Sequence, residues 1–219
     1  LERDNNSCNW SSLVNGSTNH SSYQSWHWLP IWSTCTLNIF ILDNDPVKAA
    51  QQQCDKHIVK MVLESAQMLS SAHRILDGEL ERRSSLSGKT NTKYYKLPDK
   101  REDTLYKAVH FNHPCSIWTR ESQANYDWHY LHFIALCKEY EYRYDKVHMC
   151  YTKLADVLYD SPNNIANKPQ TPFAIAMGSN PECILDDAIE SYKSFYQAKQ
   201  ANFKMLWSKR PKPTWFQYV

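Results

Sequence analysis

The chain is poor in glycine, with four glycines among 219 residues. Tight turns, hairpins and phosphate-binding loops use glycine more than any other residue. This scarcity argues against glycine-rich nucleotide-binding folds and against β architectures built from many hairpins. Long apolar runs are also missing, since no stretch approaches the roughly 20 residues that a membrane-spanning helix needs. We therefore expect an all-α protein without a membrane partner.

Neither sign of charge dominates the composition. The chain has 25 Lys and Arg against 23 Asp and Glu, which gives a net charge of +2. This excludes a histone-like polycation but leaves room for a local basic face. A hydrophobic fraction of 42% and a charged fraction of 22% predict a real core and exclude a disordered polyelectrolyte.

The cysteines and histidines show no metal-binding spacing. The seven cysteines are an odd number, and no two of them form a CxxC pair. A zinc site or a disulfide framework normally shows closer spacing, so we expect reduced cysteines that pack as small apolar groups. His129 and His132 form the best histidine pair, but no HxxxH or HExxH motif is present. We expect neither a metal nor another cofactor.

Residues 1–36 differ in composition from the remainder. They hold eight Ser, five Asn and four of the eight Trp, and no charged residue lies between Asp4 and Asp43. The chain starts with Leu1, its first Met is Met61, and leucine codons such as TTG can act as bacterial start codons. We expect the natural start at position 37, with 1–36 as translated upstream sequence. The alternative is a real, irregular N-terminal extension that packs through its tryptophans.

Residues 37–219 form one helical domain in this interpretation. Residues 38–42 are a short apolar run, expected as a small strand or a buried extended arm. Residues 79–103 are expected as a charged loop insertion, 161–172 as a loop and 208–216 as an irregular, proline-broken tail. Periodicity, start signals and breakers predict helices over about residues 46–76, 103–110, 114–144, 146–159 and 186–207.

The helix expected over 46–76 carries one polar stripe on a mostly apolar surface. At ~100° per residue, the stripe contains Gln53, Lys56, His57, Lys60, Glu64, Gln67, Ser71 and Arg74. A carboxylate near a cation and a histidine suits general acid–base chemistry, which makes Glu64 the main catalytic candidate. The alternative is a surface salt-bridge stripe, although a polar stripe on a central helix is typical of a cleft. Asp55 lies away from the stripe and is expected to be structural, as is His113.

Two basic segments carry aromatic residues and indicate nucleic-acid binding. The first is the insertion, with Arg82 and Arg83 near Tyr94 and Tyr95. The second is the C-terminal region, where aromatic side chains could equally pack on the core. Its candidate DNA-binding residues are Lys204, Trp207, Lys209, Arg210 and Lys212.

From Leu37 on, the sequence resembles phage-encoded proteins identified as pyrimidine dimer DNA glycosylases, which are similar to endonuclease V. The segments that carry the resemblance are residues 38–46, 54–67, 105–115 and 203–211. The link to endonuclease V depends mainly on an Asp-x-His followed seven residues later by Glu, here Asp55, His57 and Glu64, and on the aromatic, basic C-terminus.

The resemblance implies a DNA glycosylase and AP lyase acting on duplex DNA with UV lesions. It implies that an N-terminal α-amine, here on Asn38, forms a Schiff base at C1′, and that Glu64 stabilises the imino sugar. His57, Lys56 and Lys60 would line the site, while Arg74 and the C-terminal cations contact phosphates. An α-amine has a pKa near ~8, and a poorly stacked dimer lowers the cost of flipping. A monomer in the cytoplasm of the infected bacterial host is expected.

Two departures from the endonuclease V pattern matter for this mechanism. The chain has 37 residues before Asn38, which would bury or misplace that amine, and the spacing from Asn38 to Asp55 is longer. If the extension is real, Lys60 or Lys56 must supply the amine. Two other functions stay open: a DNA-binding or packaging accessory protein without activity, and a metal-dependent nuclease or nucleotide-modifying enzyme using His113 and Asp55.

Overall fold

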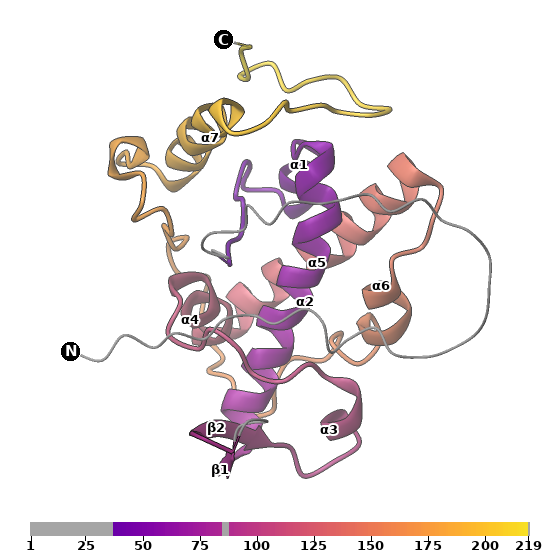
Figure 1. Ribbon diagram of the computed structural model, residues 1–219, viewed down its shortest axis with the longest axis vertical. Coiled ribbons are helices and arrows are strands. Elements are labelled where there is room, and N and C mark those ends of the chain that lie inside the picture. Colours follow the sequence, from indigo (N-terminus) through magenta and orange to yellow (C-terminus); the bar gives the residue numbers. More distant parts are fainter. Residues whose placement is uncertain (1–36, 85–87, 219) are drawn as a thin grey trace. The chain divides into compact units, whose positions relative to one another are not determined.

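The computed structural model describes residues 37–84 and 88–218. Leu37–Val219 forms a compact unit of its own, and its described residues contain seven α-helices and one antiparallel hairpin (Figure 1). The expected helical domain is therefore confirmed, except that a hairpin replaces the loop expected over residues 79–103. The irregular extension expected over 1–36 lies outside the described residues. No helix in the described ranges is long and apolar enough to cross a membrane.

Helix α2 is the central element of the domain. It packs against α5, α4 and α6 (Figure 1), and 14 of its 23 residues are buried. The hairpin and α3 lie at its C-terminal end, while α7 and the C-terminal tail lie toward its N-terminal end. The elements are α1 Pro46–Gln51, α2 Asp55–Asp77, β1 Glu79–Ser84, β2 Asn91–Lys96, α3 Arg101–Thr104, α4 Pro114–Glu121, α5 Gln123–Tyr144, α6 Met149–Leu154 and α7 Ala188–Ala198, with 3-10 turns at Pro181–Cys183 and Lys199–Ala201.

The apolar run after Leu37 is a buried extended arm and not a strand. Ile39, Ile41 and Leu42 are each at most 1% exposed, and the Phe40 ring stacks on His57 of α2 with 4.4 Å between centroids. Burial of such side chains stabilises a fold by about 1.5–3 kcal/mol each. The arm is thereby fixed along α2, which places Asn38 beside the middle of that helix.

The single helix expected over 46–76 is broken at residues 52–54. The C-terminal region supplies hydrogen bonds to the backbone there: Trp207 Nε1 donates to Gln52 O at 2.9 Å, and Asp55 N donates to Leu206 O at 2.8 Å. The Tyr196 hydroxyl accepts from Cys54 N at 2.6 Å. Unpaired backbone groups are costly when buried, and here distant residues satisfy them, so no local signal marks the break.

The remaining helices are also shorter than expected. The helix expected over 114–144 is divided at Ser122, whose side chain caps α5 by accepting from Asn125 N at 3.1 Å. Those expected over 146–159 and 186–207 contract to α6 and α7. All five cysteines of the described residues are buried and unpaired, as expected, whereas Cys8 and Cys35 lie outside the described ranges.

Arg74 is a structural residue and not the predicted phosphate contact. Its side chain is 1% exposed, and all five N–H groups are used by neighbouring segments. They donate to the carbonyls of Tyr95, Glu102, Leu105 and Tyr106 and to the Glu102 carboxylate, over 2.6–2.9 Å. The guanidinium thus holds residues 105–106 in a non-helical course, which explains why the helix expected over 103–110 ends at Thr104.

The hairpin begins directly after Gly78, where α2 ends. A Cβ at this position would collide with the carbonyl oxygen of Arg74 and crowd that of Lys96, so glycine is required by the close approach of helix and strand. The register runs from Glu79 opposite Lys96 to Ser84 opposite Asn91. Most of its side chains are exposed, which leaves its cations available to solvent.

His73 makes the stability of the fold sensitive to acid. Tyr126 donates its hydroxyl to Leu158 O and so accepts from His73 Nε2, while Arg101 donates to His73 Nδ1 at 3.0 Å. Burial and then Arg101 lower the pKa of His73 from 6.5 to about 4. As the pH falls, His73 takes up a proton in the unfolded chain before it does so in the folded protein. The contribution of neutral His73 to the free energy of unfolding is therefore complete above pH 6.5 and is lost as the pH falls toward 4.

We expect the neutral substitution His73→Gln to flatten this pH dependence. Between pH 7 and pH 4 the parent protein should lose about 3 kcal/mol more unfolding free energy than the variant. Urea unfolding at a series of pH values measures the difference. Parallel curves for the two proteins would contradict the assignment.

Candidate active site

The Glu64 carboxylate lies at the centre of the candidate site. The residue is 4% exposed, and its two oxygens have different partners. Asn38 N donates to Oε2 at 3.2 Å, and Lys60 Nζ forms an ion pair with Oε1 at 2.8 Å. The Lys60 side chain is 36% exposed, so it is the solvent-facing member of the pair. The structure therefore brings together three of the four predicted catalytic residues.

The charge state of Glu64 is set by opposing effects. Burial raises the pKa of its carboxyl, while Lys60, the Asn38 N–H and Lys199 each act to lower it, and burial prevails. A raised pKa makes a carboxyl group a better proton donor and acceptor near neutral pH. Burial of Glu64 also distinguishes this pair from an exposed helix salt bridge.

Asn38 is held rigidly at its side chain, so its backbone nitrogen is fixed next to Glu64. Its Nδ2 donates to Ala176 O at 3.0 Å, and its Oδ1 accepts from the Tyr192 hydroxyl at 3.0 Å and from Ile39 N at 2.8 Å. Asn38 is 3% exposed. The 3.2 Å separation between Asn38 N and Glu64 therefore follows from three other hydrogen bonds of the same residue.

His57, the fourth predicted catalytic residue, lines the site as a buried neutral ring. Tyr196 donates its hydroxyl to His57 Nδ1 at 2.8 Å, because that hydroxyl already accepts from Cys54 N. Burial, followed by the charges of Lys199, Lys60 and Lys56, lowers the pKa of His57 well below its usual value. The ring therefore carries no charge near pH 7 and serves packing with Phe40.

Lys199 belongs to this site and was not among the predicted site residues. It is half-buried, its Nζ lies 4.3 Å from the Phe195 ring centroid, and Lys60 and Glu64 both act on its pKa. Lys56 is exposed, with Nζ 4.7 Å from the Phe203 centroid. The only sequence signal for Lys199 was its place near aromatics at the start of the C-terminal region.

The predicted DNA-binding residues of the C-terminal tail mostly have partners inside the protein. Trp207 is 9% exposed and packs edge-on against Phe216, and Arg210 is paired with Glu139 at 2.9 Å. Lys209 is paired with Asp145 at 2.7 Å, and Lys212 donates to Phe216 O. Lys204 is exposed. Trp207 is thus a core residue and not available for base stacking.

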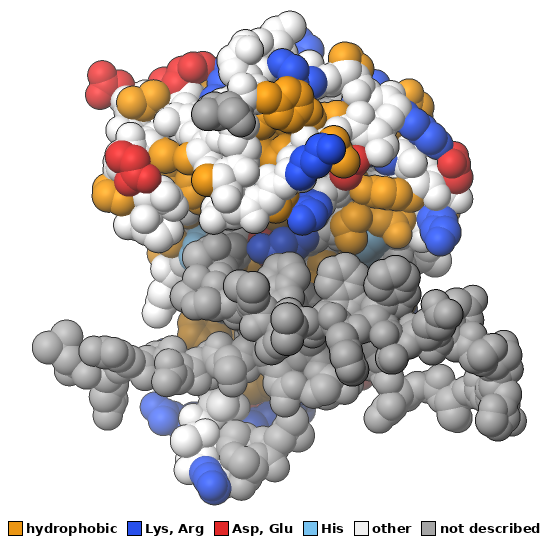
Figure 2. Space-filling model, turned by 45° about the horizontal axis from the view of Figure 1, so that its top comes forward, with side chains coloured by type: hydrophobic (Ala, Val, Ile, Leu, Met, Phe, Trp, Pro, Cys, Tyr) orange, Lys and Arg blue, Asp and Glu red, His pale blue; other side chains and the backbone are white. Residues whose placement is uncertain are grey.

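On the visible part of the face that includes α7 and the tail, Lys and Arg side chains lie scattered among hydrophobic ones (Figure 2).

The other predicted DNA contacts, Arg82 and Arg83, are exposed on β1 at the opposite end of α2 (Figure 1). Arg83 pairs with Glu81 at 2.8 Å and stacks over Tyr94. The structure therefore separates the basic hairpin from the basic residues around Glu64.

Asp55, which was expected to be structural, joins α5 and the C-terminal tail to the start of α2. Its carboxylate pairs with Arg143 at 2.9 Å and accepts from Ser208 N at 2.9 and 3.0 Å. Through these bonds it fixes the tail to the start of α2.

His113 caps α4 by accepting from Cys115 N at 3.3 Å. It therefore belongs to a different hydrogen-bond network from Asp55. Within residues 37–84 and 88–218, no group of three or more His, Cys, Asp or Glu side chains is placed to hold a metal ion. The pair His129 and His132 is buried in the core, where both rings have lowered pKa values caused mainly by burial.

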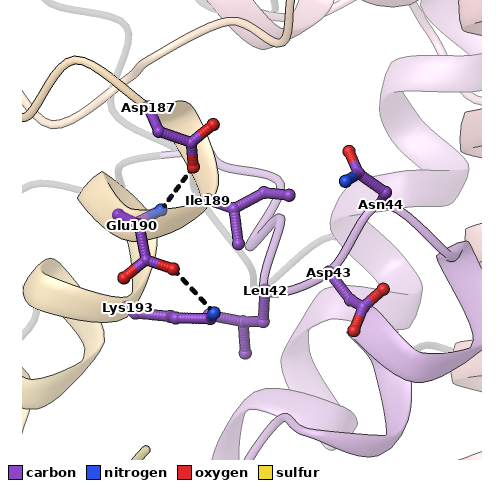
Figure 3. A pocket seen from close by; sticks show the side chains of 7 residues that line it. All are labelled: Leu42, Asp43, Asn44, Asp187, Ile189, Glu190 and Lys193. Carbon is purple, nitrogen blue, oxygen red and sulfur yellow. Dashed lines mark hydrogen bonds and ion pairs between the residues drawn. The ribbon is translucent and has the colours of Figure 1, made fainter.

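An open hollow of about 380 Å³ lies between residues 42–44 and the start of α7 (Figure 3). Its acidic side chains have partners. Asp187 accepts from Glu190 N at 2.9 Å, and Glu190 pairs with Lys193 at 2.8 Å. Asp43 accepts from Asp45 N at 3.0 Å. The carboxylates that line the hollow thus all have partners, and none of them is buried as Glu64 is.

Comparison with known proteins returns no relative. No protein-family model matches the chain, and neither the curated proteins nor the solved structures contain a match. The functional argument therefore depends on the geometry around Glu64.

We expect Lys60→Met to raise the pKa of Glu64 further, because it removes the cation that opposes burial. Titration of the carboxyl carbon by ¹³C NMR in the parent and the variant measures the shift. Lys138→Met removes a comparable but exposed pairing with Glu141 and serves as the control. An unchanged or lower Glu64 pKa in Lys60→Met would contradict the pairing.

Proposed function

We propose that this protein is a DNA glycosylase and AP lyase that acts on UV-induced pyrimidine dimers through a Schiff base. The observation that carries the proposal is the 3.2 Å hydrogen bond between Asn38 N and Glu64 Oε2. In a chain that begins at Asn38, this nitrogen is an α-amine in direct contact with a buried carboxyl group. The resemblance to pyrimidine dimer DNA glycosylases implies this pair of groups.

The chemistry needs an amine and a carboxyl that exchanges protons. The neutral amine attacks C1′ of the damaged nucleotide, and the bond from C1′ to the base breaks with its electron pair leaving on the base, which is then protonated. Opening of the sugar ring converts the amino sugar into an imine, with a proton going to O4′. Removal of a C2′ proton then expels the 3′ phosphate by β-elimination.

Glu64 is suited to the proton transfers in this sequence. As a carboxylic acid it gives a proton to O4′, and as a carboxylate it accepts the proton from C2′. Its pKa is raised by burial, which brings the two forms closer in population near neutral pH. Lys60, which is paired with Glu64 at 2.8 Å, supplies positive charge that favours binding of a flanking phosphate.

We expect the chain that begins at Asn38 to be trapped on DNA by borohydride. A duplex with a defined cyclobutane dimer is incubated with this protein and reductant, and the covalent adduct is resolved by denaturing electrophoresis. Glu64→Gln should lower strand cleavage by about 100-fold or more. Glu190→Gln, an exposed carboxylate on α7, is the matched control and should cleave normally.

Two outcomes would overturn the proposal. If the protein binds the duplex without an adduct or strand cleavage, it is a DNA-binding protein without lyase activity. If Glu64→Gln cleaves as well as Glu190→Gln, the carboxylate has only a structural role. Matching unfolding midpoints of the two variants would exclude loss of the fold as the cause of a difference.

The exposed cation next to the site gives a further test on binding. We expect Lys56→Met to reduce the slope of log Kd against log salt concentration by about 0.9, the value for one lost phosphate contact. Lys153→Met on α6, also exposed, should leave the slope unchanged. Equal slopes in both variants would place the DNA elsewhere on the surface.

A further inference from the structure

A second amine, that of Lys199, lies close enough to Glu64 for their charges to interact, and it belongs to the 219-residue chain itself. In that chain Asn38 N is a peptide nitrogen, whose lone pair is delocalised into the carbonyl group and so is not a nucleophile. A lysine is then required for imine formation, and the sequence suggested Lys60 or Lys56. The contacts of Lys60, Lys56 and Lys199 show which of these lysines is suited to this role.

Lys60 and Lys56 are poorly placed as the reacting amine. Lys60 Nζ is held in an ion pair with Glu64 Oε1 at 2.8 Å, which an attack on a carbonyl carbon would have to break. Lys56 is exposed, so its Nζ is not shielded from water. Neither lysine combines shielding from water with the absence of a carboxylate partner.

Lys199 combines both features. It occupies the turn that follows α7, and its Nζ lies 4.3 Å from the Phe195 centroid and 5.5 Å from that of Phe40. Among the described residues it forms no ion pair within 4.0 Å. Its side chain is half-buried, so a ligand can reach it from solvent without unfolding the site.

The groups around Lys199 have opposing effects on its pKa. Burial first, and then the charge of Lys60, lower its pKa, while Glu64 and Cys54 raise it, and the net shift is downward. His57, the remaining titratable neighbour in this site, is neutral near pH 7. A larger fraction of Lys199 is thus unprotonated than for a lysine in water.

We propose that Lys199 forms an imine with the open-chain aldehyde of an abasic deoxyribose, with Glu64 as the proton donor. This inference depends on the proposed function, because it names the amine that the full chain uses for the same reaction. It places a lysine at the end of α7 in a role that the resemblance gives to an α-amine.

The reaction balances without an oxidant or reductant. The Nζ lone pair of Lys199 attacks the aldehyde carbon and gives a carbinolamine. The carbonyl oxygen, after accepting one proton transferred from nitrogen and one from Glu64, leaves as water. The lone pair on nitrogen forms the C=N bond, and Glu64 is left as the carboxylate that takes the C2′ proton in the elimination.

The test uses the full 219-residue protein, a duplex with one abasic site, and borohydride as the trap. We expect a covalent adduct that peptide mapping by mass spectrometry places on Lys199, and its loss in Lys199→Arg, which keeps the positive charge. Lys193→Arg on α7, where the parent lysine is paired with Glu190, is the control and should be trapped like the parent. Unfolding midpoints of the two variants check that both fold.

The chain that begins at Asn38 is assayed in parallel, which separates the two proposals. If it is trapped on DNA while the full chain is not, Lys199 is not the amine and the proposed function stands. An adduct of the full chain on Lys60, on Lys56 or on the terminal amine also overturns the assignment to Lys199. If neither chain is trapped, both proposals fail together.

Discussion

The arrangement of this domain depends on one buried carboxylate in the middle of its central helix. An isolated charge in the interior costs several kcal/mol unless it is paired, and Glu64 is compensated by one cation and one backbone N–H. The N–H comes from the arm before α1, so this arm must lie along α2 for the charge to be tolerated. The carboxylate and the packing of the arm therefore support one another.

The same constraint explains why the polar stripe of α2 is not a surface salt-bridge stripe. At its C-terminal end Arg74 is enclosed by residues 95–106 and satisfies their carbonyls. In the middle, Ser71 is bonded to Val109, and Glu64 is bonded to Asn38. On this stripe Lys56, Lys60 and Gln67 keep part of their side chains in solvent. Glu64 is therefore a buried carboxylate with partly exposed polar neighbours about one helical turn before and after it.

Local patterns in the sequence predicted much of this domain and failed where distant residues decide. The helix start expected at residue 46 is confirmed, with Asp45 as the N-cap, and most of the helix expected over 46–76 forms as α2 with Glu64 on it. The break at 52–54 is held by Trp207 and Tyr196, more than 140 residues away. Arg74 was predicted as a phosphate contact because no local pattern links it to its buried partners, which include Tyr95 and Glu102.

Lys199 illustrates why a candidate site is harder to predict than a helix. Its environment is made by Phe40 from the arm, Phe195 from α7 and the Lys60–Glu64 pair from α2, three segments that only the tertiary fold brings together. Arg210 shows the converse, since a basic and aromatic tail has the composition of a DNA contact, yet Glu139 neutralises this charge inside the protein. Composition detects cations, whereas the counter-charges that decide their reactivity are fixed by packing.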